Sequence, residues 1–370
     1  MDSDSDIAAI QACITNRLDS TVITNHLLAG VIGDAPSQYS KSPALWNAAF
    51  RLLGMNAIYL PFDIEGRRLK ELTSALRDSE RVLGANVTVP HKRSIMDHLD
   101  ELDAGAARIQ AVNTIVRTDN GRLIGHNTDG EGFIESILQP QPGDRRSLID
   151  SLKDIEVILL GAGGSARAVA FQVADLLSNG RLLICNRTFA HARALAEQVS
   201  KAGRNAQAIR EEELSHWAPQ VQLIINSTTK GQGGTRELDQ GKTISLEPYS
   251  ALAPAHPVVV PKSGHETGDT QDTVKASEAD IQNNNEASIS LATSIPKSVR
   301  FYDLVYFPEE TVFLRHARLT GHRTMNGKAM IINQAVIAFC KRICRADLQA
   351  RGIDNPGTCK QILEAMYRAW

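Results

Sequence analysis

A glycine-rich turn between an apolar run and a helix-like stretch limits the folds open to this chain more than any other feature. Residues 156–164 read EVILLGAGG, and residues 165–177 continue as SARAVAFQVADLL. The apolar run predicts a buried strand, and the stretch after the glycines predicts a helix. The N-terminus of that helix would face any anion bound at the turn, because its first backbone N–H groups have no partner within the helix.

The same alternation continues through the middle of the chain. RLLICNR (181–187) predicts a second strand, AHARALAEQVSKAG (190–203) a second helix, and VQLIINST (221–228) a third strand. Strands and helices at this spacing form a parallel sheet through right-handed crossovers. The sequence therefore predicts an α/β fold with the outline of a nucleotide-binding half-domain.

The glycine turn fits the pattern G-x-G-x-x-A. Gly161 allows the tight turn, Gly163 lets a pyrophosphate approach the backbone, and Ala166 keeps the helix close to the strand. A tight turn without a ligand is the alternative interpretation of so short a pattern. Because strand, turn and helix occur in the required order, we expect a dinucleotide site that includes Gly161, Gly163 and Gly164.

The end of the second predicted strand indicates which dinucleotide would bind. NAD sites usually have a carboxylate there, about 20 residues after the glycines, to bind the ribose 2′-hydroxyl. This chain has Asn186, Arg187 and Thr188 instead. A guanidinium can bind a 2′-phosphate through two hydrogen bonds, whereas a carboxylate would repel it. The residues favour NADP and leave NAD possible, and an ordinary exposed arginine is the alternative explanation of Arg187.

The first part of the chain also alternates between strand-like and helix-like segments. Residues 27–33, 57–64 and 83–89 are apolar runs that predict strands. Asn120–Gly121 predicts a hairpin within residues 112–127, because both residue types tolerate the positive φ of a tight turn.

Three polar residues in this part could carry chemistry, but each has an ordinary structural explanation. Ser42 could cap the helix that Pro43 begins, Lys92 could be solvated in a loop, and Asp129 could cap the helix that follows it. Singly, none of the three indicates a function.

The charge balance and the apolar pattern exclude several classes of protein. The 370 residues include 40 Lys and Arg and 42 Asp and Glu, a formal charge of −2, which argues against a polybasic nucleic-acid surface. No apolar run reaches the roughly 18–20 residues of a membrane span. The acidic N-terminus differs from a secretory signal, and five cysteines without framework spacing predict reduced thiols in the cytoplasm. Histidines and cysteines show no metal-ligand spacing, so we expect no metal.

One polar segment interrupts the second half of the chain. Residues 263–298 lack aromatic side chains and are rich in Ser, Thr, Asp, Glu and Asn. Such a segment buries too little apolar surface to offset the entropy of ordering, so we predict a mostly disordered insertion. It could be a passive surface loop, a partner-binding segment or a lid, and we favour the passive loop.

Taken together, the motifs resemble one family. In chain order they are S-x-S-P at 40–43, N-V-T-x-P-x-K at 86–92, A-V-N-T at 111–114, N-T-D-G at 127–130, G-A-G-G at 161–164 and N-R-T at 186–188. The match continues at Tyr306, Pro308, Thr311, Gly327, Gln334 and Ala335. This order resembles the shikimate dehydrogenase family, which includes the quinate/shikimate dehydrogenases, over about residues 29–340 except the insertion.

The resemblance implies two α/β domains with a cleft between them. Residues 1–128 plus 326–370 would form the substrate-binding domain, and residues 129–325 the Rossmann-type NAD(P)-binding domain. Lys92 and Asp129 match the family's catalytic pair. The residues implied to bind substrate are Ser40, Ser42, Thr88, Asn113, Tyr306 and Gln334. Those implied to bind the cofactor are Gly161, Gly163, Gly164, Asn186, Arg187, Thr188 and Gly327.

The activity implied is the reversible oxidation of shikimate to 3-dehydroshikimate by hydride transfer, with NADP favoured over NAD. Quinate is the rival substrate, although a Ser-x-Ser pair goes with shikimate preference in this family. A non-catalytic protein that binds shikimate or quinate is a second alternative. Another two-domain NADP enzyme, such as a methylenetetrahydrofolate dehydrogenase, would explain the glycine turn but not S-K-S-P or N-T-D-G.

Three residues depart from the family pattern. Trp46 stands where a histidine is common, and Ala329 replaces the second glycine of a usual G-x-G-M. His191 takes the place where NADP-using relatives often have a second basic residue. The first two departures would suit a non-catalytic protein, and the third weakens the preference for NADP because histidine is largely neutral at pH 7.

Overall fold

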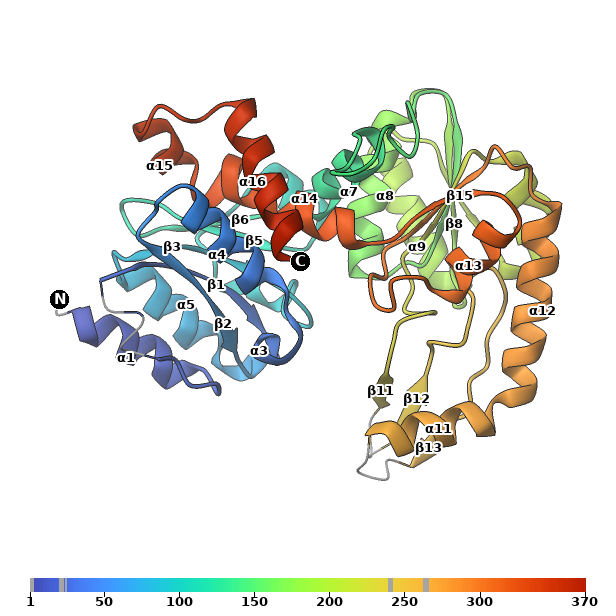
Figure 1. The fold of residues 1–370 in the computed structure, drawn as a ribbon, viewed down its shortest axis with the longest axis horizontal. Coiled ribbons are helices and arrows are strands. Elements are labelled where there is room, and N and C mark those ends of the chain that lie inside the picture. Colours follow the sequence, from blue (N-terminus) through green and yellow to red (C-terminus); the bar gives the residue numbers. More distant parts are fainter. Residues whose placement is uncertain (1–2, 20–22, 24, 239–241, 262–265) are drawn as a thin grey trace. The chain divides into compact units, whose positions relative to one another are not determined.

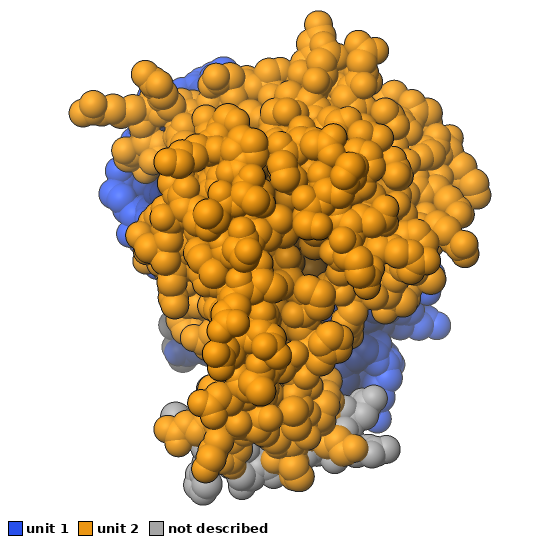
Figure 2. All heavy atoms as spheres, turned by 90° about the vertical axis from the view of Figure 1, so that its right-hand side faces the viewer, with its two compact units in different colours: residues 1–135, 331–370 blue, residues 136–330 orange. Residues whose placement is uncertain are grey.

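The computed structural model describes residues 3–19, 23, 25–238, 242–261 and 266–370. The chain divides into two compact units, coloured separately in Figure 2. Unit 1 comprises residues 1–135 and 331–370, and unit 2 comprises residues 136–330. The unit boundaries lie within ten residues of the domain boundaries expected from the sequence, at 128 and 326.

Unit 1 is built on a six-stranded mixed sheet with the strand order β2-β1-β3-β5-β6-β4. The parallel part contains β1 (Leu27–Gly33), β2 (Ala57–Asp63) and β3 (Val82–Val87). The predicted hairpin is confirmed as the antiparallel pair β5 (Thr114–Arg117) and β6 (Leu123–His126). The edge strand β4 (Glu101–Leu102) pairs with β6.

Helices cover both faces of this sheet, as expected for strands that are apolar on both sides. Alternate residues of β1 take part in two separate cores, with Leu28 and Ile32 in one and Ala29 and Val31 in the other. The first core includes residues of α1 (Ser3–Cys13) and α5 (Leu69–Asp78). The second includes residues of α4 (Ser42–Leu52), α14 (Lys328–Ala338) and α16 (Pro356–Ala369).

Unit 2 is built on a six-stranded parallel sheet with the strand order β15-β14-β10-β7-β8-β9. The predicted strands are confirmed as β7 (Glu156–Leu160), β8 (Arg181–Cys185) and β10 (Leu223–Asn226). The remaining strands are β9 (Ala206–Ile209), β14 (Arg300–Asp303) and β15 (Arg323–Met325). Numbered within this sheet, the order is 3-2-1-4-5-6 from β9 to β15, the doubly wound arrangement of dinucleotide-binding domains. The crossovers after β7 and β8 are α8 (Gly164–Leu176) and α9 (Phe189–Lys201).

The prediction that residues 263–298 are mostly disordered is wrong for the part that the structure describes. This part forms α11 (Glu266–Ala276) and α12 (Glu278–Ser294), whereas residues 262–265 lie outside the described residues. A small antiparallel sheet precedes the helices, formed by β11 (Thr235–Leu238), β12 (Lys242–Ser245) and β13 (Val260–Pro261). Figure 1 shows α12 running from this sheet back toward α13 (Val312–Leu319).

Polar side chains explain why α12 is ordered. The Asn284 amide is buried and donates hydrogen bonds to the backbone carbonyls of Ser250 (3.1 Å), Ala253 (3.1 Å) and Pro254 (2.9 Å). Ser288 is also buried, with its hydroxyl 2.7 Å from the Ser250 hydroxyl. The prediction from composition considered only the burial of apolar side chains. It therefore missed a helix whose buried polar side chains all find hydrogen-bond partners.

The other helices are short. They are α3 (Pro36–Tyr39), α6 (Ala104–Ile109), α7 (Asp129–Leu138), α10 (Leu214–Trp217) and α15 (Arg345–Ala350). Single 3₁₀ turns occur at Gly66–Arg68, Ser94–His98, Glu211–Glu213 and Ala218–Gln220, and a π-helical turn at Phe339–Ile343. Among the described helices, none is both long and apolar enough to cross a membrane.

Candidate active site

In unit 1, Lys92 and Asp129 form a close ion pair. Lys92 lies in the turn after β3, and Asp129 is the first residue of α7. The Lys92 Nζ donates to Asp129 Oδ2 over 2.6 Å, and the side chains are 22% and 9% exposed. The pair is therefore shielded from bulk water but still reachable, which suits a group that exchanges protons with a bound molecule.

Asn113 holds the other oxygen of this carboxylate. The Asn113 Nδ2 donates to Asp129 Oδ1 (2.8 Å) and lies 3.2 Å from Gln334 Oε1. Its Oδ1 accepts the backbone N–H of Thr128 (2.8 Å), which fixes the start of α7. Four predicted residues (Lys92, Asn113, Asp129 and Gln334) thus meet in one hydrogen-bonded network, although they come from distant parts of the chain.

The backbone of α7 at Gly132 lies very close to the backbone of Gln334. A Cβ atom on Gly132 would lie 2.5 Å from the Gln334 backbone nitrogen, so only glycine fits at this position. The second glycine of the sequence D-G-E-G at 129–132 therefore has a packing function that the sequence reasoning did not identify.

The predicted serine pair lies between α3 and α4. Ser40 follows α3, and its Oγ accepts the backbone N–H of Ser42 over 3.2 Å. The N-cap of α4 is Lys41 and Ser42 is the first helical residue, so the interpretation of Ser42 as the cap is wrong. Thr88, which follows β3, is half-buried, and its methyl group occupies the space beside Gly33, where a Cβ atom would lie 2.6 Å away.

Trp46 has a structural role in this unit. Its ring is completely buried and stacks on Tyr59, with ring centroids 4.8 Å apart. The Tyr59 hydroxyl in turn donates to Asn86 Oδ1 over 2.7 Å. Burial raises the pKa of Tyr59 well above its usual value, so this hydroxyl stays a neutral donor. The residue that departs from histidine at position 46 therefore belongs to the hydrophobic core of unit 1.

In unit 2, the glycine turn borders a cavity of about 570 Å³. Gly161 has φ of +112° and stands so close to Ser227 that an added Cβ atom would lie 2.6 Å from its Oγ. A Cβ atom added at Gly163 or at Gly164 would meet no atom within 4 Å, so this space is open to a ligand at the N-terminus of α8. The cavity lining includes five of the residues that the sequence implies for cofactor binding, and Gly164 begins the helix beside it. The five are Gly161, Gly163, Asn186, Arg187 and Thr188.

The electrostatics of this cavity suit a multiply charged anion. Arg187, His191 and Arg236 line it, and none of the three forms an ion pair with another described residue. Lys230 also lines it but is paired with Glu211 over 3.1 Å. Arg236 was missed by the sequence reasoning, because it lies on β11, 49 residues after Arg187 and outside any motif.

Two predicted residues of unit 2 lie outside this cavity lining. Tyr306 is half-buried in the loop between β14 and α13, and burial raises the pKa of its hydroxyl. Gly327 is buried, and a Cβ atom added there would lie 2.0 Å from the carbonyl oxygen of Leu304. Gly327 therefore allows a close backbone approach beside the loop that carries Tyr306.

A buried carboxylate anchors the same loop. Asp303, at the end of β14, accepts hydrogen bonds from Asn226 Nδ2 (2.9 Å), the Val305 N–H (2.9 Å) and the Thr311 hydroxyl (2.6 Å). Burial raises the pKa of Asp303 to about 7, although these three hydrogen bonds act in the opposite direction. Asp303 thus joins the cofactor-side strand β10 to the loop of Tyr306.

This raised pKa predicts a pH-dependent stability. The folded chain keeps the Asp303 proton up to about pH 7, whereas the unfolded chain loses it near pH 4. The stability from this group is therefore present below about pH 4 and is lost as the pH rises to about 7. Asp303→Asn retains the shape of the protonated form, so we expect its melting temperature to fall less over this range than that of the wild type. The exposed Asp272→Asn is the control and should behave like the wild type. An equal fall in melting temperature for Asp303→Asn and the wild type over this pH range would contradict the assignment.

Family models match both units. The shikimate dehydrogenase substrate binding domain matches residues 31–115, and the shikimate / quinate 5-dehydrogenase model matches residues 145–233. Among curated relatives, the shikimate dehydrogenase (NADP(+)) of Desulforamulus reducens is 34% identical over 308 residues, which is 82% of this chain and 86% of that protein.

Solved structures agree with this result. The shikimate 5-dehydrogenase from Thermus thermophilus, in complex with NADP(H) and shikimate, superposes with a TM-score of 0.63 at 27% identity, over 93% of this chain and 100% of that one. The shikimate 5-dehydrogenase from Listeria monocytogenes, in complex with shikimate and NAD, gives a TM-score of 0.64 at 26% identity, over 88% and 93%. By its sequence and by its fold, this chain belongs to the shikimate dehydrogenase family.

Proposed function

We propose that this chain interconverts shikimate and 3-dehydroshikimate with NADP as the hydride carrier. The observation that supports this most strongly is the shielded Lys92–Asp129 pair, with 2.6 Å between Nζ and Oδ2. The open glycine turn supports the cofactor, as does Arg187, which forms no ion pair with any residue that the structure describes. Relatives that are named shikimate dehydrogenase (NADP(+)) and share 31–34% identity make shikimate the first choice over quinate.

The chemistry divides between the cofactor and the protein. NADP, which the residues around Gly161 and Arg187 would hold, would supply the hydride acceptor for oxidation and the hydride donor for reduction. Lys92 takes up the hydroxyl proton during oxidation and donates it to the ketone oxygen during reduction. Asp129 keeps the amine of Lys92 at one position, and Asn113 keeps Asp129 in place.

The remaining residues of unit 1 provide the binding groups. The hydroxyls of Ser40 and Ser42 would donate to the substrate carboxylate. Thr88, Gln334 and Tyr306 would bind ring hydroxyls, as the resemblance to the family implies. Asn113 uses its amide within the protein, so we assign it a positioning function as well as the predicted contact with substrate.

The residues of unit 2 fit NADP. The backbone at Gly161, Gly163 and Gly164 would hold the pyrophosphate, and Arg187 would bind the 2′-phosphate together with Asn186 and Thr188. Arg236 adds a cation to the same cavity. The cavity lining thus contains a second arginine in addition to Arg187.

Isotope transfer tests this proposal directly. Shikimate that carries deuterium on the carbon bearing the reacting hydroxyl should pass the deuterium to NADP⁺, and the reduced cofactor can be examined by mass spectrometry. Deuterium in the reduced cofactor is the expected result. Ketone formation with no deuterium in the cofactor would contradict direct hydride transfer.

The positioning function of Asn113 gives a prediction of its own. Asn113→Ala leaves Asp129 Oδ1 without its donor, so we expect kcat to fall about 100-fold because the catalytic pair is misplaced. The KM for NADP should not change, because Asn113 does not line the cofactor cavity. Kinetics below the melting temperature of the variant check both values. An equal loss in kcat and in NADP affinity would indicate general misfolding instead.

A further inference from the structure

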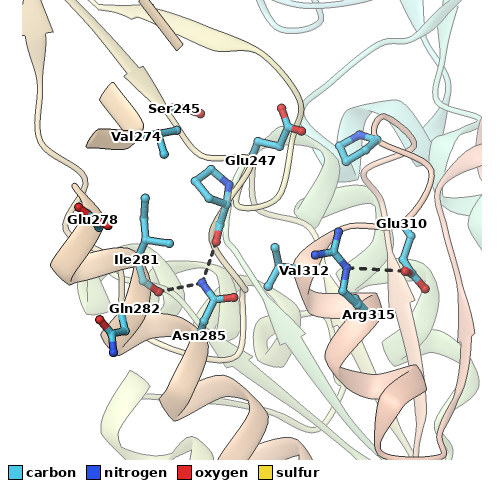
Figure 3. Close-up of a pocket in the computed structure, with 12 residues that line it drawn as sticks. Ser245, Glu247, Val274, Glu278, Ile281, Gln282, Asn285, Glu310, Val312 and Arg315 are labelled. Carbon is cyan, nitrogen blue, oxygen red and sulfur yellow. Dashed lines mark hydrogen bonds and ion pairs between the residues drawn. The ribbon is translucent and has the colours of Figure 1, made fainter. Parts of the chain in front are cut away.

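A second cavity of unit 2, of about 640 Å³, is lined by α12, α13 and the segment after β12. Figure 3 shows Glu278, Ile281 and Asn285 on one side of it and Val312 and Arg315 on the other. All residues that line it fall between 245 and 315, beyond the residues that the family models match. No residue lines both this cavity and the cofactor cavity. The proposed binding of NADP therefore does not account for the second cavity.

A buried hydroxyl belongs to a residue that lines this cavity. Ser245 is only 3% exposed, and its Oγ makes no hydrogen bond to any described residue. Burying a hydroxyl without a partner destabilises a protein, because the hydroxyl loses its hydrogen bonds to water. Because Ser245 lines the cavity, a polar group of a bound molecule could supply the missing hydrogen bond.

Two carboxylates of the cavity also have no counter-charge. Glu310 is paired with Arg318 (2.5 Å) and lies 3.7 Å from Arg315. Glu247 and Glu278 form no ion pair with any residue that the structure describes, and Glu247 only accepts the backbone N–H of Gly234 (3.1 Å). The cavity therefore has an excess of negative charge, which a cation would neutralise.

The rest of the lining is largely apolar. Val274, Ile281 and Val312 contribute aliphatic side chains, and Pro248 and Pro308 contribute rings. A simple metal ion would leave these surfaces in contact with water. An organic cation would cover them with its hydrocarbon part while its charged group pairs with the carboxylates.

We propose that this cavity binds a small organic cation, an ammonium or guanidinium group on an apolar body, through Ser245, Glu247 and Glu278. The volume lies within the roughly 300–1,000 Å³ typical of small-molecule sites. The site lies on the segment that the family models do not match, and Pro308 connects it to the loop of Tyr306.

Three probes of equal chain length test the proposal. Hexylamine, 1-hexanol and hexanoate differ in charge but carry the same alkyl chain, and each is titrated calorimetrically into the full chain without substrate or cofactor. We expect hexylamine to bind at least about tenfold more tightly than hexanol, and hexanoate not to bind. Equal affinity for hexylamine and hexanol would overturn the proposal.

Substitutions of the lining residues test whether hexylamine binds in this cavity. Glu247→Gln combined with Glu278→Gln should weaken hexylamine about tenfold, and Ser245→Ala should weaken it less. Glu286→Gln is the matched control, because Glu286 is exposed on the same helix but does not line the cavity. Unchanged hexylamine affinity in the folded double variant would overturn the assignment. Since no turnover is measured, the result is independent of the proposed dehydrogenase activity.

Discussion

Replacing Lys92 by alanine is expected to lower kcat for shikimate oxidation roughly 10³-fold while NADP still binds. General acid–base groups contribute about 10²–10⁴-fold to rates. The Lys92 amine lies 2.6 Å from Asp129 Oδ2, and no other lysine of the described residues forms an ion pair with that carboxylate. The loss should appear in kcat, because the proton is transferred in the transition state, and only weakly in the KM for NADP.

The matched control is Lys70→Ala, which removes an exposed lysine of α5 in the same unit. Its turnover should equal that of the wild type. A melting temperature of Lys92→Ala close to the wild-type value would show that the loss is chemical. Near-normal turnover in Lys92→Ala would remove this lysine from the mechanism.

Replacing Arg187 by alanine is expected to raise the KM for NADP at least tenfold and to leave the KM for NAD nearly unchanged. A hydrogen bond to a charged group contributes about 1.5–3 kcal/mol, which is roughly a 10- to 150-fold change in binding. Arg187 is exposed, lines the cofactor cavity and has no ion-pair partner among the described residues, so its guanidinium is available to a phosphate. NAD lacks this phosphate, which makes the effect selective.

Arg193→Ala provides the control for this prediction. Arg193 lies on the same helix, α9, but is paired with Glu197 at 3.7 Å and does not line the cavity. Its removal should change neither KM value. Equal increases for NADP and NAD in Arg187→Ala would show that the residue does not bind the 2′-phosphate.

Local patterns predicted the parallel sheet of unit 2. The run EVILLGAGG places a strand, a turn and a helix N-terminus within nine residues, and each depends on neighbours in the sequence. The same holds for the hairpin at Asn120–Gly121, where the turn residues themselves determine the backbone conformation.

Contacts between distant segments could not be predicted in this way. Gly132 is required by the Gln334 backbone, about 200 residues later, and no local pattern indicates that contact. Arg236 lines the cofactor cavity from β11, which no local pattern connects with the glycine turn. The ordered α12 was missed for another reason, since Asn284 stabilises it through buried hydrogen bonds that composition does not reveal.

The measurement that tests the central proposal most directly is the initial rate of cofactor reduction with four pairs of substrates. Shikimate and quinate are each combined with NADP⁺ and NAD⁺, and the absorbance of the reduced nicotinamide is followed. The proposal predicts the highest kcat/KM for shikimate with NADP⁺. A higher value for quinate would contradict the proposed substrate. No turnover with any pair, together with a rise in melting temperature on adding shikimate, would contradict catalysis and indicate a protein that only binds its ligand.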